Sequence, residues 1–386
     1  MNIEISKRVE QLAPSGIRAF FDLVLGMKDV ISLGVGEPDF VTPWVIREKA
    51  VDALEQGFTS YTSNKGMPEL RKDIARFLKR RYDLSYCFEE EILITVGVSE
   101  ALDLVARAIL NPGDKVLVPE PVYVSYAPVV ELAGGRAVTL KTSLETGFKL
   151  TPGQIEAACA RGGVKALMIN YPCNPTGVSY TSEELKALAR VVKKHNILVI
   201  SDEVYDELTY DFTHTPFASL PHMKDRVIYL NGFSKSYAMT GFRVGYACGP
   251  ANVIAAMTKI HQYTMLCASI EGQIAASEAL RNGARSVQMM KKEYQRRRNY
   301  IVGALNEIGL SCHQPQGAFY VFPSIRSTAE SSMDFAANLL RRQRVALVPG
   351  TAFGASCEGY VRISYASSYA NLKEAVARIE AYLRDR

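Results

Sequence analysis

Short apolar runs alternate with helical segments between residues 91 and 249, and this alternation limits the fold more than any other feature of the chain. The runs are unbroken, as expected of strands buried on both faces, and the segments between them carry apolar residues at helical spacing. This order predicts an α/β fold, in which a mainly parallel sheet is flanked by helices in one large domain. Functional side chains of such sheets gather at the carboxyl ends of the strands.

Three polar residues each follow one of these runs and are therefore expected to converge. Asn174 follows residues 164–170, Asp202 follows 197–200 and Lys235 follows 227–230. A carboxylate at the end of an apolar strand is costly to bury unless a cation meets it, although Asp202 could instead cap the next helix. An enclosed lysine has a lowered pKa and can attack a carbonyl, whereas an ordinary loop lysine would face solvent.

Two features near these residues suit a phosphate group. In the stretch NGFSKSYAMTGFRVGY, residues 231–246, Arg243 offers a planar charged fork and Ser234 a hydroxyl. The run that begins at Glu91 ends in Gly97 and leads into a helical pattern, so the backbone N–H groups of Val98 and Ser99 are expected to be free at a helix start. By itself the second signal is weak, because every strand-to-helix unit has such a start.

The segment around Lys235 resembles the lysine signature of class I aminotransferases, which belong to the fold type I group of pyridoxal phosphate enzymes. Gly232-Phe-Ser-Lys235, Met239-Thr-Gly-Phe-Arg243 and Gly245 carry the resemblance. It extends over nearly the whole chain and is similar to the subgroup with aromatic and N-acetyl-diaminopimelate aminotransferases. One departure is Gly232, which stands where some members carry a serine that contacts the phosphate.

The resemblance implies pyridoxal 5′-phosphate as cofactor and Lys235 as the residue that holds it and then moves a proton as general base. It implies that Asp202 keeps the pyridine nitrogen protonated. The remaining positions that match cofactor contacts of the family are Gly97, Val98, Ser99, Tyr123, Asn174, Tyr205, Ser234 and Arg243. For Tyr123, which would stack on the ring, packing into the core is an equal alternative.

Substrate contacts are implied at Gly36, Asn174 and Arg362, of which Arg362 would hold the α-carboxylate with two hydrogen bonds. An exposed strand arginine and, at Gly36, a simple tight turn are the alternatives. Gly34-Val-Gly36 is not a dinucleotide loop, because Asp39 takes the place of the third glycine. Tyr61 matches a tyrosine that reaches the phosphate of the partner subunit in the family, which implies a homodimer; a solvent-facing loop tyrosine is the alternative.

The implied reaction moves an amino group from an aromatic, neutral or N-acylated diamino L-amino acid to a 2-oxo acid, with 2-oxoglutarate the usual acceptor, by a ping-pong mechanism. Ser99 stands where some aspartate-specific relatives have a lysine, which disfavours aspartate as donor. A carbon–sulfur lyase could use the same residues. A cofactor-sensing regulator would need a DNA-binding module, and few residues precede Gly36.

Composition excludes several other classes of protein. The net charge of +5, from 45 Lys and Arg against 40 Asp and Glu, is too small to predict nucleic-acid binding. Seven scattered cysteines without a Cys-x-x-Cys pair predict reduced thiols in a cytoplasmic protein. The five histidines lack metal-ligand spacing, so no metal is expected, and no run is long and apolar enough to predict a membrane span or a signal peptide.

The predicted domains are an N-terminal arm with part of the small domain (1–40), a large cofactor-binding domain (41–283) and a small α+β domain (284–386). The arm contains an amphipathic stretch with Val9, Leu12, Phe20 and Leu23. Strand-like runs at 317–322, 345–348 and 360–364 belong to the small domain. Residues 285–305 are predicted to form a helix whose basic residues, Lys291, Lys292, Arg296, Arg297 and Arg298, make a solvated face.

Overall fold

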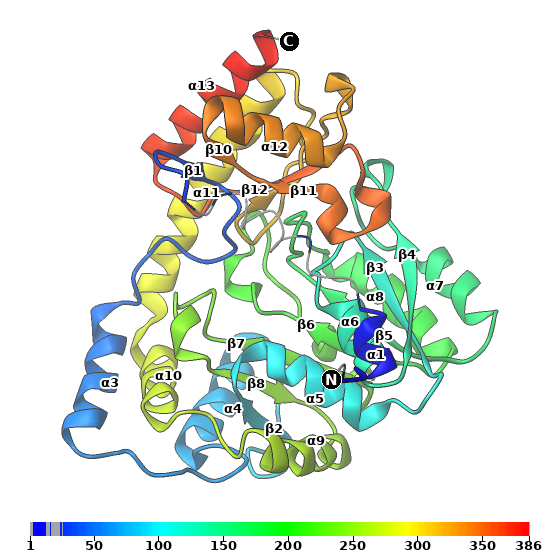
Figure 1. The fold of residues 1–386 in the computed structure, drawn as a ribbon. Helices are drawn as coiled ribbons and strands as arrows, with labels where there is room; N and C mark the ends of the chain where they lie inside the picture. Colours follow the sequence, from blue (N-terminus) through cyan, green and yellow to red (C-terminus); the bar gives the residue numbers. More distant parts are fainter. Residues whose placement is uncertain (1–2, 13–15, 17–23, 25, 386) are drawn as a thin grey trace.

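The computed structural model describes residues 3–12, 16, 24 and 26–385 (Figure 1). The chain begins with a short helix, α1 (Lys7–Glu10), in which no residue is buried. Val9 is exposed and Leu12 is half-buried on this single chain, and the packing of the predicted amphipathic arm stays a prediction. Phe20 and Leu23 lie outside the described residues.

The centre of the fold is a seven-stranded sheet with the order β2-β8-β7-β6-β5-β3-β4. Its strands are β2 (Ile92–Thr95), β3 (Lys115–Glu120), β4 (Arg136–Lys141), β5 (Val164–Asn170), β6 (Leu198–Asp202), β7 (Val227–Gly232) and β8 (Gly245–Cys248). β8 runs antiparallel to β2 and β7, and the remaining pairs are parallel. The predicted mainly parallel sheet is confirmed.

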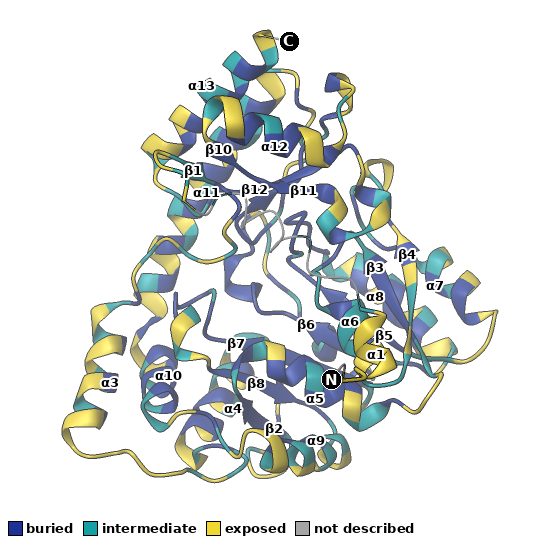
Figure 2. Cartoon of the chain, in the orientation of Figure 1, coloured by how far each residue is buried: buried dark blue, intermediate teal, exposed yellow. Residues whose placement is uncertain are grey.

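Helices cover both faces of this sheet, and its strands are largely buried except for the edge strand β4 (Figure 2). The helices are α3 (Trp44–Glu55), α4 (Pro68–Tyr82), α5 (Gly97–Ile109), α6 (Tyr126–Leu132), α7 (Pro152–Cys159), α8 (Ser182–Lys194), α9 (Ala251–Thr264) and α10 (Ile270–Asn282). α5, α6 and α9 share one apolar core with one side of the sheet, in which Leu102 and Ile254 are buried. A capping box formed by Thr181 and Glu184 starts α8.

A second core lies above the central sheet in Figure 1. Its strands are β1 (Ile31–Ser32), which pairs in parallel with β10 (Val345–Ala346), and β9 (Tyr320–Val321), β11 (Val348–Pro349) and β12 (Val361–Ser364), which form an antiparallel sheet. Its helices are α11 (Ala284–Glu307), α12 (Ser332–Gln343) and α13 (Tyr369–Arg384). Strands and helices mix here as predicted for the smaller part, whereas the domain boundaries stay a prediction.

Short 3-10 helices interrupt the loops of both parts. They lie at Leu144–Thr146, Asp206–Leu208, Phe217–Ser219, Lys224–Arg226, Thr240–Phe242, Arg326–Thr328, Gly350–Phe353 and Ala355–Cys357. Asp206–Leu208 comes shortly after β6, and Thr240–Phe242 follows the loop after β7. Both therefore come after the carboxyl ends of adjacent strands. In the described part of the chain, no helix is both long and apolar enough to cross a membrane.

The predicted solvated face of α11 is wrong for Arg297 and Arg298, which are buried. Both guanidinium groups are paired with carboxylates that come from loops beside the helix. Arg297 Nη1 donates to both Asp39 oxygens at 2.9 Å, and Arg298 donates to Asp211 at 2.6 and 2.9 Å. The interleaved charges of the sequence could not reveal these partners, because each lies far away along the chain.

Replacing Arg298 by methionine is expected to lower the free energy of unfolding by about 2 kcal/mol, since loss of one partner of a buried ion pair is costly. Asp211 is 38% exposed in its side chain, so water can solvate the remaining carboxylate and keep the loss below that of a fully buried pair. Thermal or urea unfolding measures the change. An unchanged stability of Arg298→Met would contradict this reading of the helix.

Candidate active site

A cavity of about 610 Å³ lies at the carboxyl ends of β5, β6 and β7. The predicted site residues that line it are Gly36, Val98, Ser99, Tyr123, Asn174, Asp202, Tyr205, Ser234, Lys235, Arg243 and Arg362. The strand-end rule predicted the convergence of Asn174, Asp202 and Lys235, and all three line this cavity. Gly97 lies directly behind this lining, and Tyr61 lies elsewhere on the surface with 82% of its area exposed.

Lys235 follows β7 and projects into the cavity half-buried. Its Nζ donates a hydrogen bond to the Gly36 carbonyl at 2.7 Å. Burial lowers the pKa of Lys235 to about 8; Glu37 opposes this shift, whereas Arg362 and Arg243 add to it. A substantial fraction of the amine is therefore neutral near pH 8, as a nucleophile or general base requires.

Asp202 is the last residue of β6 and is 4% exposed. Its Oδ2 accepts a hydrogen bond from the Tyr126 hydroxyl at 2.7 Å, and its Oδ1 accepts one from the Val204 N–H at 3.2 Å. Burial raises the pKa of Asp202 to about 6, although both hydrogen bonds favour the ionised form. The carboxylate is thus costly in the free protein, and a cation in the cavity would offset that cost.

The variant Asp202→Asn is expected to be more stable than the unmodified protein at pH 8 when both are free of ligands. The folded-state pKa of about 6 exceeds the value of about 3.9 in unfolded chains. The folded state therefore binds the proton more tightly, and the ionised group costs up to about 3 kcal/mol well above pH 6, a cost that vanishes below about pH 4. Melting curves should show a difference in melting temperature between the two proteins at pH 8 that disappears at pH 4. Equal melting temperatures at pH 8 would contradict the raised pKa of Asp202.

Arg362 lies on β12 and is 2% exposed, which rules out the alternative of a surface arginine. Its Nη1 donates to Asn174 Oδ1 at 2.8 Å and its Nη2 to the Gly34 carbonyl at 2.6 Å. The guanidinium lies between the rings of Tyr320 and Phe353, 4.6 and 4.9 Å from their centroids. Nε has no partner among the described residues, so its N–H can still donate a hydrogen bond to an anion's oxygen.

Asn174 is held in place by Asn170, a residue that the sequence analysis did not single out. The Asn174 N–H donates to Asn170 Oδ1 at 2.9 Å, and Asn170 Nδ2 donates to the Asp202 carbonyl at 2.9 Å. One amide side chain therefore couples the ends of β5 and β6. In the sequence, Asn170 stands out only as the polar last residue of the apolar run 164–170.

The start of α5 and the Arg243 side chain form one concave corner of the cavity, which we call the anion cradle. Gly97 has a φ of +73°, and a Cβ atom there would collide with the Arg243 guanidinium. A Cβ at Gly245 would lie 2.6 Å from the Val98 nitrogen. Only glycine allows this close approach. The first turn of a helix has N–H groups without helical acceptors, so the corner can bind an anion with backbone donors and one guanidinium.

Further cavity contacts involve residues that the sequence analysis had not predicted. The Tyr205 and Tyr320 hydroxyl oxygens lie 3.0 Å apart. Thr240 donates a hydrogen bond to Glu37 across the cavity at 3.2 Å. Tyr126 and Tyr320 would each be assigned to the apolar core by their spacing, because their neighbours are buried apolar residues. Their hydroxyl partners become apparent only in three dimensions.

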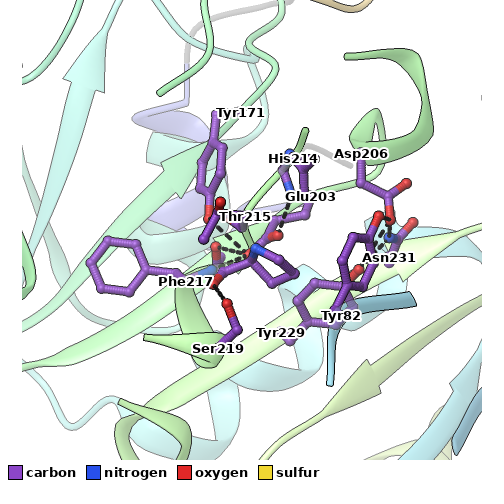
Figure 3. Close-up of polar contacts among 12 residues, drawn as sticks. Tyr82, Tyr171, Glu203, Asp206, His214, Thr215, Phe217, Ser219, Tyr229 and Asn231 are labelled. Atoms are coloured by element: carbon purple, nitrogen blue, oxygen red, sulfur yellow. Dashed lines mark hydrogen bonds and ion pairs between the residues drawn. The ribbon is translucent and has the colours of Figure 1, made fainter. Parts of the chain in front are cut away.

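The segment that carries Asp202 and Tyr205 is anchored by polar residues that do not line the cavity (Figure 3). Glu203, which is fully buried, contacts His214 Nε2 through Oε2 at 2.6 Å and accepts a hydrogen bond from the Tyr171 hydroxyl through Oε1 at 3.1 Å. The His214 and Tyr171 rings stack with centroids 5.1 Å apart. This pair therefore holds β6 to the loop around residue 214 without lining the cavity.

Asp206 provides a second anchor on the same side (Figure 3). Its Oδ2 accepts hydrogen bonds from Asn231 Nδ2 at 2.9 Å and from the Tyr82 hydroxyl at 2.8 Å. Asn231 Oδ1 in turn accepts the Gly232 N–H at 2.6 Å. The segment after β6 is thereby tied to the end of β7, three residues before Lys235.

Comparisons with known proteins agree with these features. The sequence model of the family described as aminotransferase class I and II matches residues 28–379. The putative aminotransferase YugH of Bacillus subtilis (strain 168) is 52% identical over 383 residues, and an aspartate aminotransferase of Pyrococcus abyssi (strain GE5 / Orsay) is 45% identical over 385; each alignment covers 99% of both chains. The crystal structure of an aromatic aminotransferase from Pyrococcus horikoshii OT3 has a TM-score of 0.91 at 44% identity, covering 95% of this chain and 99% of that one.

Proposed function

This chain belongs to the class I and II aminotransferases, and from that premise we propose that it holds pyridoxal 5′-phosphate on Lys235 and takes its amino group from an aromatic, neutral or N-acylated diamino L-amino acid. Transfer of an amino group is the activity that its family and its relatives share. The observation that carries the proposal is the buried amine of Lys235, with a pKa lowered to about 8, in one cavity with Asp202 and Arg362.

The residues of the cavity fit this cofactor chemically. The anion cradle offers helix N–H groups, Arg243 and the Ser234 hydroxyl, a donor set suited to a phosphate dianion. Asp202 is a buried carboxylate that lacks a cationic partner among its hydrogen bonds, and a protonated pyridine nitrogen would supply one. Tyr123, Asn174 and Tyr205 complete the walls with a ring face and polar groups.

When bound, pyridoxal phosphate supplies an aldehyde that takes up amino groups and a ring that accepts the electron pair left at the substrate α-carbon. Lys235 holds the cofactor, and its amine then takes the α-proton and returns it as general base and acid. Asp202 would stabilise the positive charge of the cofactor's protonated pyridine nitrogen. In the protein without cofactor, the Lys235 amine donates a hydrogen bond to the Gly36 carbonyl at 2.7 Å.

Arg362 is the proposed contact for the substrate α-carboxylate, with Asn174 beside it. The cationic side chains among the described residues of the cavity lining are Lys235, Arg243 and Arg362. Each of these already has a proposed role, which leaves none of them for a second carboxylate. This distribution of charge and the serine at position 99, where some aspartate-specific relatives have a lysine, support an aromatic or neutral donor over aspartate. Aspartate is still included in the test, because some relatives are aspartate aminotransferases.

We further propose that the protein is a homodimer in which Tyr61 reaches the cofactor phosphate of the partner. Large apolar side chains are exposed on the single chain near Tyr61 in the sequence and near residue 265; they include Val41, Trp44, Leu54, Phe58, Tyr263 and Met265. Exposed apolar surface of this kind is typical of interfaces. Sedimentation equilibrium of the purified protein tests the proposal, and a monomer at micromolar concentration would contradict it.

The reaction is tested with a panel of amino donors against 2-oxoglutarate, with the products identified by mass spectrometry. The expected outcome is glutamate formation that is faster with aromatic or neutral donors than with aspartate, and parallel double-reciprocal lines. Intersecting lines would contradict the ping-pong mechanism. Release of pyruvate and ammonia without any amino acceptor would instead favour the carbon–sulfur lyase alternative.

A further inference from the structure

Behind the anion cradle lies a buried pair, Glu100 and His261, and we propose that His261 neutralises Glu100 so that the start of α5 can accept a phosphate dianion. Neither residue lines the cavity. The inference rests on the proposed function, since it concerns the phosphate of the same site. His261 acts here through another side chain and is a positioning residue.

Glu100 lies in the first turn of α5 and turns back toward the start of the helix. Its Oε2 accepts a hydrogen bond from the Val96 N–H at 2.5 Å, and its Oε1 lies 2.6 Å from His261 Nδ1. The side chains of Glu100 and His261 are 7% and 0% exposed. His261 comes from α9, which packs against α5, and its other ring nitrogen has no hydrogen-bond partner among the described residues. Glu100 is therefore the polar contact that the ring makes.

A carboxylate at this position stabilises the helix start but competes with the ligand proposed for the same place. Acidic groups near a helix N-terminus interact favourably with its dipole, as a phosphate does. Two anions at one helix end repel each other, and burial weakens the screening of that repulsion by water. A protonated His261 removes the net charge of Glu100 while leaving its hydrogen bond to Val96 intact.

The chain contains a matched pair with which to test this proposal. Glu203 and His214 also lie 2.6 Å apart and are buried, but Glu203 follows β6 and His214 lies in a loop, so the pair is not at the start of α5 (Figure 3). In His261→Asn, the amide nitrogen takes the place of Nδ1 and keeps the donor to Glu100 while removing the charge. In His214→Gln, the amide nitrogen likewise replaces the Nε2 that contacts Glu203. Each variant thus preserves one hydrogen bond and loses one ionisable ring.

The affinities of the full-length protein, freed of cofactor, are measured by calorimetry for inorganic phosphate, pyridoxal phosphate and pyridoxal. His261→Asn is expected to weaken binding of both phosphate-bearing ligands about tenfold, or about 1.4 kcal/mol, and to leave pyridoxal binding unchanged. The double variant Glu100→Gln/His261→Asn is expected to bind phosphate as the unmodified protein does. His214→Gln should keep all three affinities, even if it lowers the melting temperature.

An unchanged phosphate affinity in His261→Asn would overturn the proposal. A double variant that binds phosphate as weakly as the single variant would overturn it too, because removing Glu100 would not rescue a purely structural role of His261. A second measurement does not depend on the single variant folding. In ¹⁵N spectra of histidine-labelled protein, assigned with the double variant, both ring nitrogens of His261 should be protonated, and a neutral ring would overturn the proposal. If the unmodified protein fails to bind pyridoxal phosphate at all, the proposed function fails instead.

Discussion

Replacing Lys235 by alanine is expected to lower kcat by about 10⁴-fold or more, because one side chain both holds the cofactor and moves the α-proton. The amine lies in the cavity with its pKa lowered to about 8 by burial. Removing a buried, poorly solvated cation should leave the melting temperature of the ligand-free protein unchanged or raise it. Turnover with the preferred donor and thermal unfolding are the two measurements.

Lys235→Arg serves as the control for charge, since arginine stays protonated and cannot act as a base. It should be as inactive as the alanine variant. Borohydride treatment of the protein with pyridoxal phosphate, followed by peptide mass spectrometry, should modify residue 235 in the unmodified protein alone. Modification at a different lysine, or turnover within tenfold of normal in Lys235→Ala, would refute the assignment.

Replacing Arg362 by leucine is expected to reduce kcat/KM by about 10²- to 10³-fold, since loss of a buried partner of a carboxylate costs several kcal/mol. Most of the change should appear in KM, because the α-carboxylate binds Arg362 before and during the reaction alike. Lys235 and Asp202 remain in place. Steady-state kinetics with one amino donor and one 2-oxo acid should therefore show losses in both half-reactions.

Arg298→Met is the matched control for a buried arginine outside the cavity. It should lose stability, as argued above, but keep its KM below the melting temperature. Arg362→Lys should recover part of the loss, because an ammonium group attracts the carboxylate without matching its fork. If Arg362→Leu kept its KM for both substrates, the α-carboxylate would have to bind elsewhere.

Sequence reasoning predicted the features of the fold and site that have short-range signals. Apolar runs of strand length gave the central sheet, and their carboxyl ends led to Asn174, Asp202 and Lys235. The helix predicted over residues 285–305 and observed over Ala284–Glu307 has a local pattern of the same kind. In each case, the residues that determine the structure are neighbours in the chain.

Features that depend on partners far apart in the sequence were not predicted. The burial of Arg297 depends on Asp39, more than 250 positions away, and the Tyr126 hydroxyl finds Asp202 only after α6 packs on the sheet. Glu100 and His261 are separated by 161 positions. Charge alone suggests solvent exposure, so buried ionic pairs of this kind mislead pattern-based reading. The predicted homodimer and the role of Tyr61 depend on a second chain and stay predictions.

The loop after β1 provides backbone carbonyls that replace water around the side chains of Arg362 and Lys235. Its carbonyls at Gly34 and Gly36 hydrate Arg362 and Lys235 as water would, and Asp39, bound to Arg297, keeps the loop in place. A ligand carboxylate can replace a backbone carbonyl as the hydrogen-bond acceptor. The cationic side chains then never lose all of their acceptors when the ligand binds. We therefore expect the loop to favour ligands that carry a carboxylate over amines that lack one.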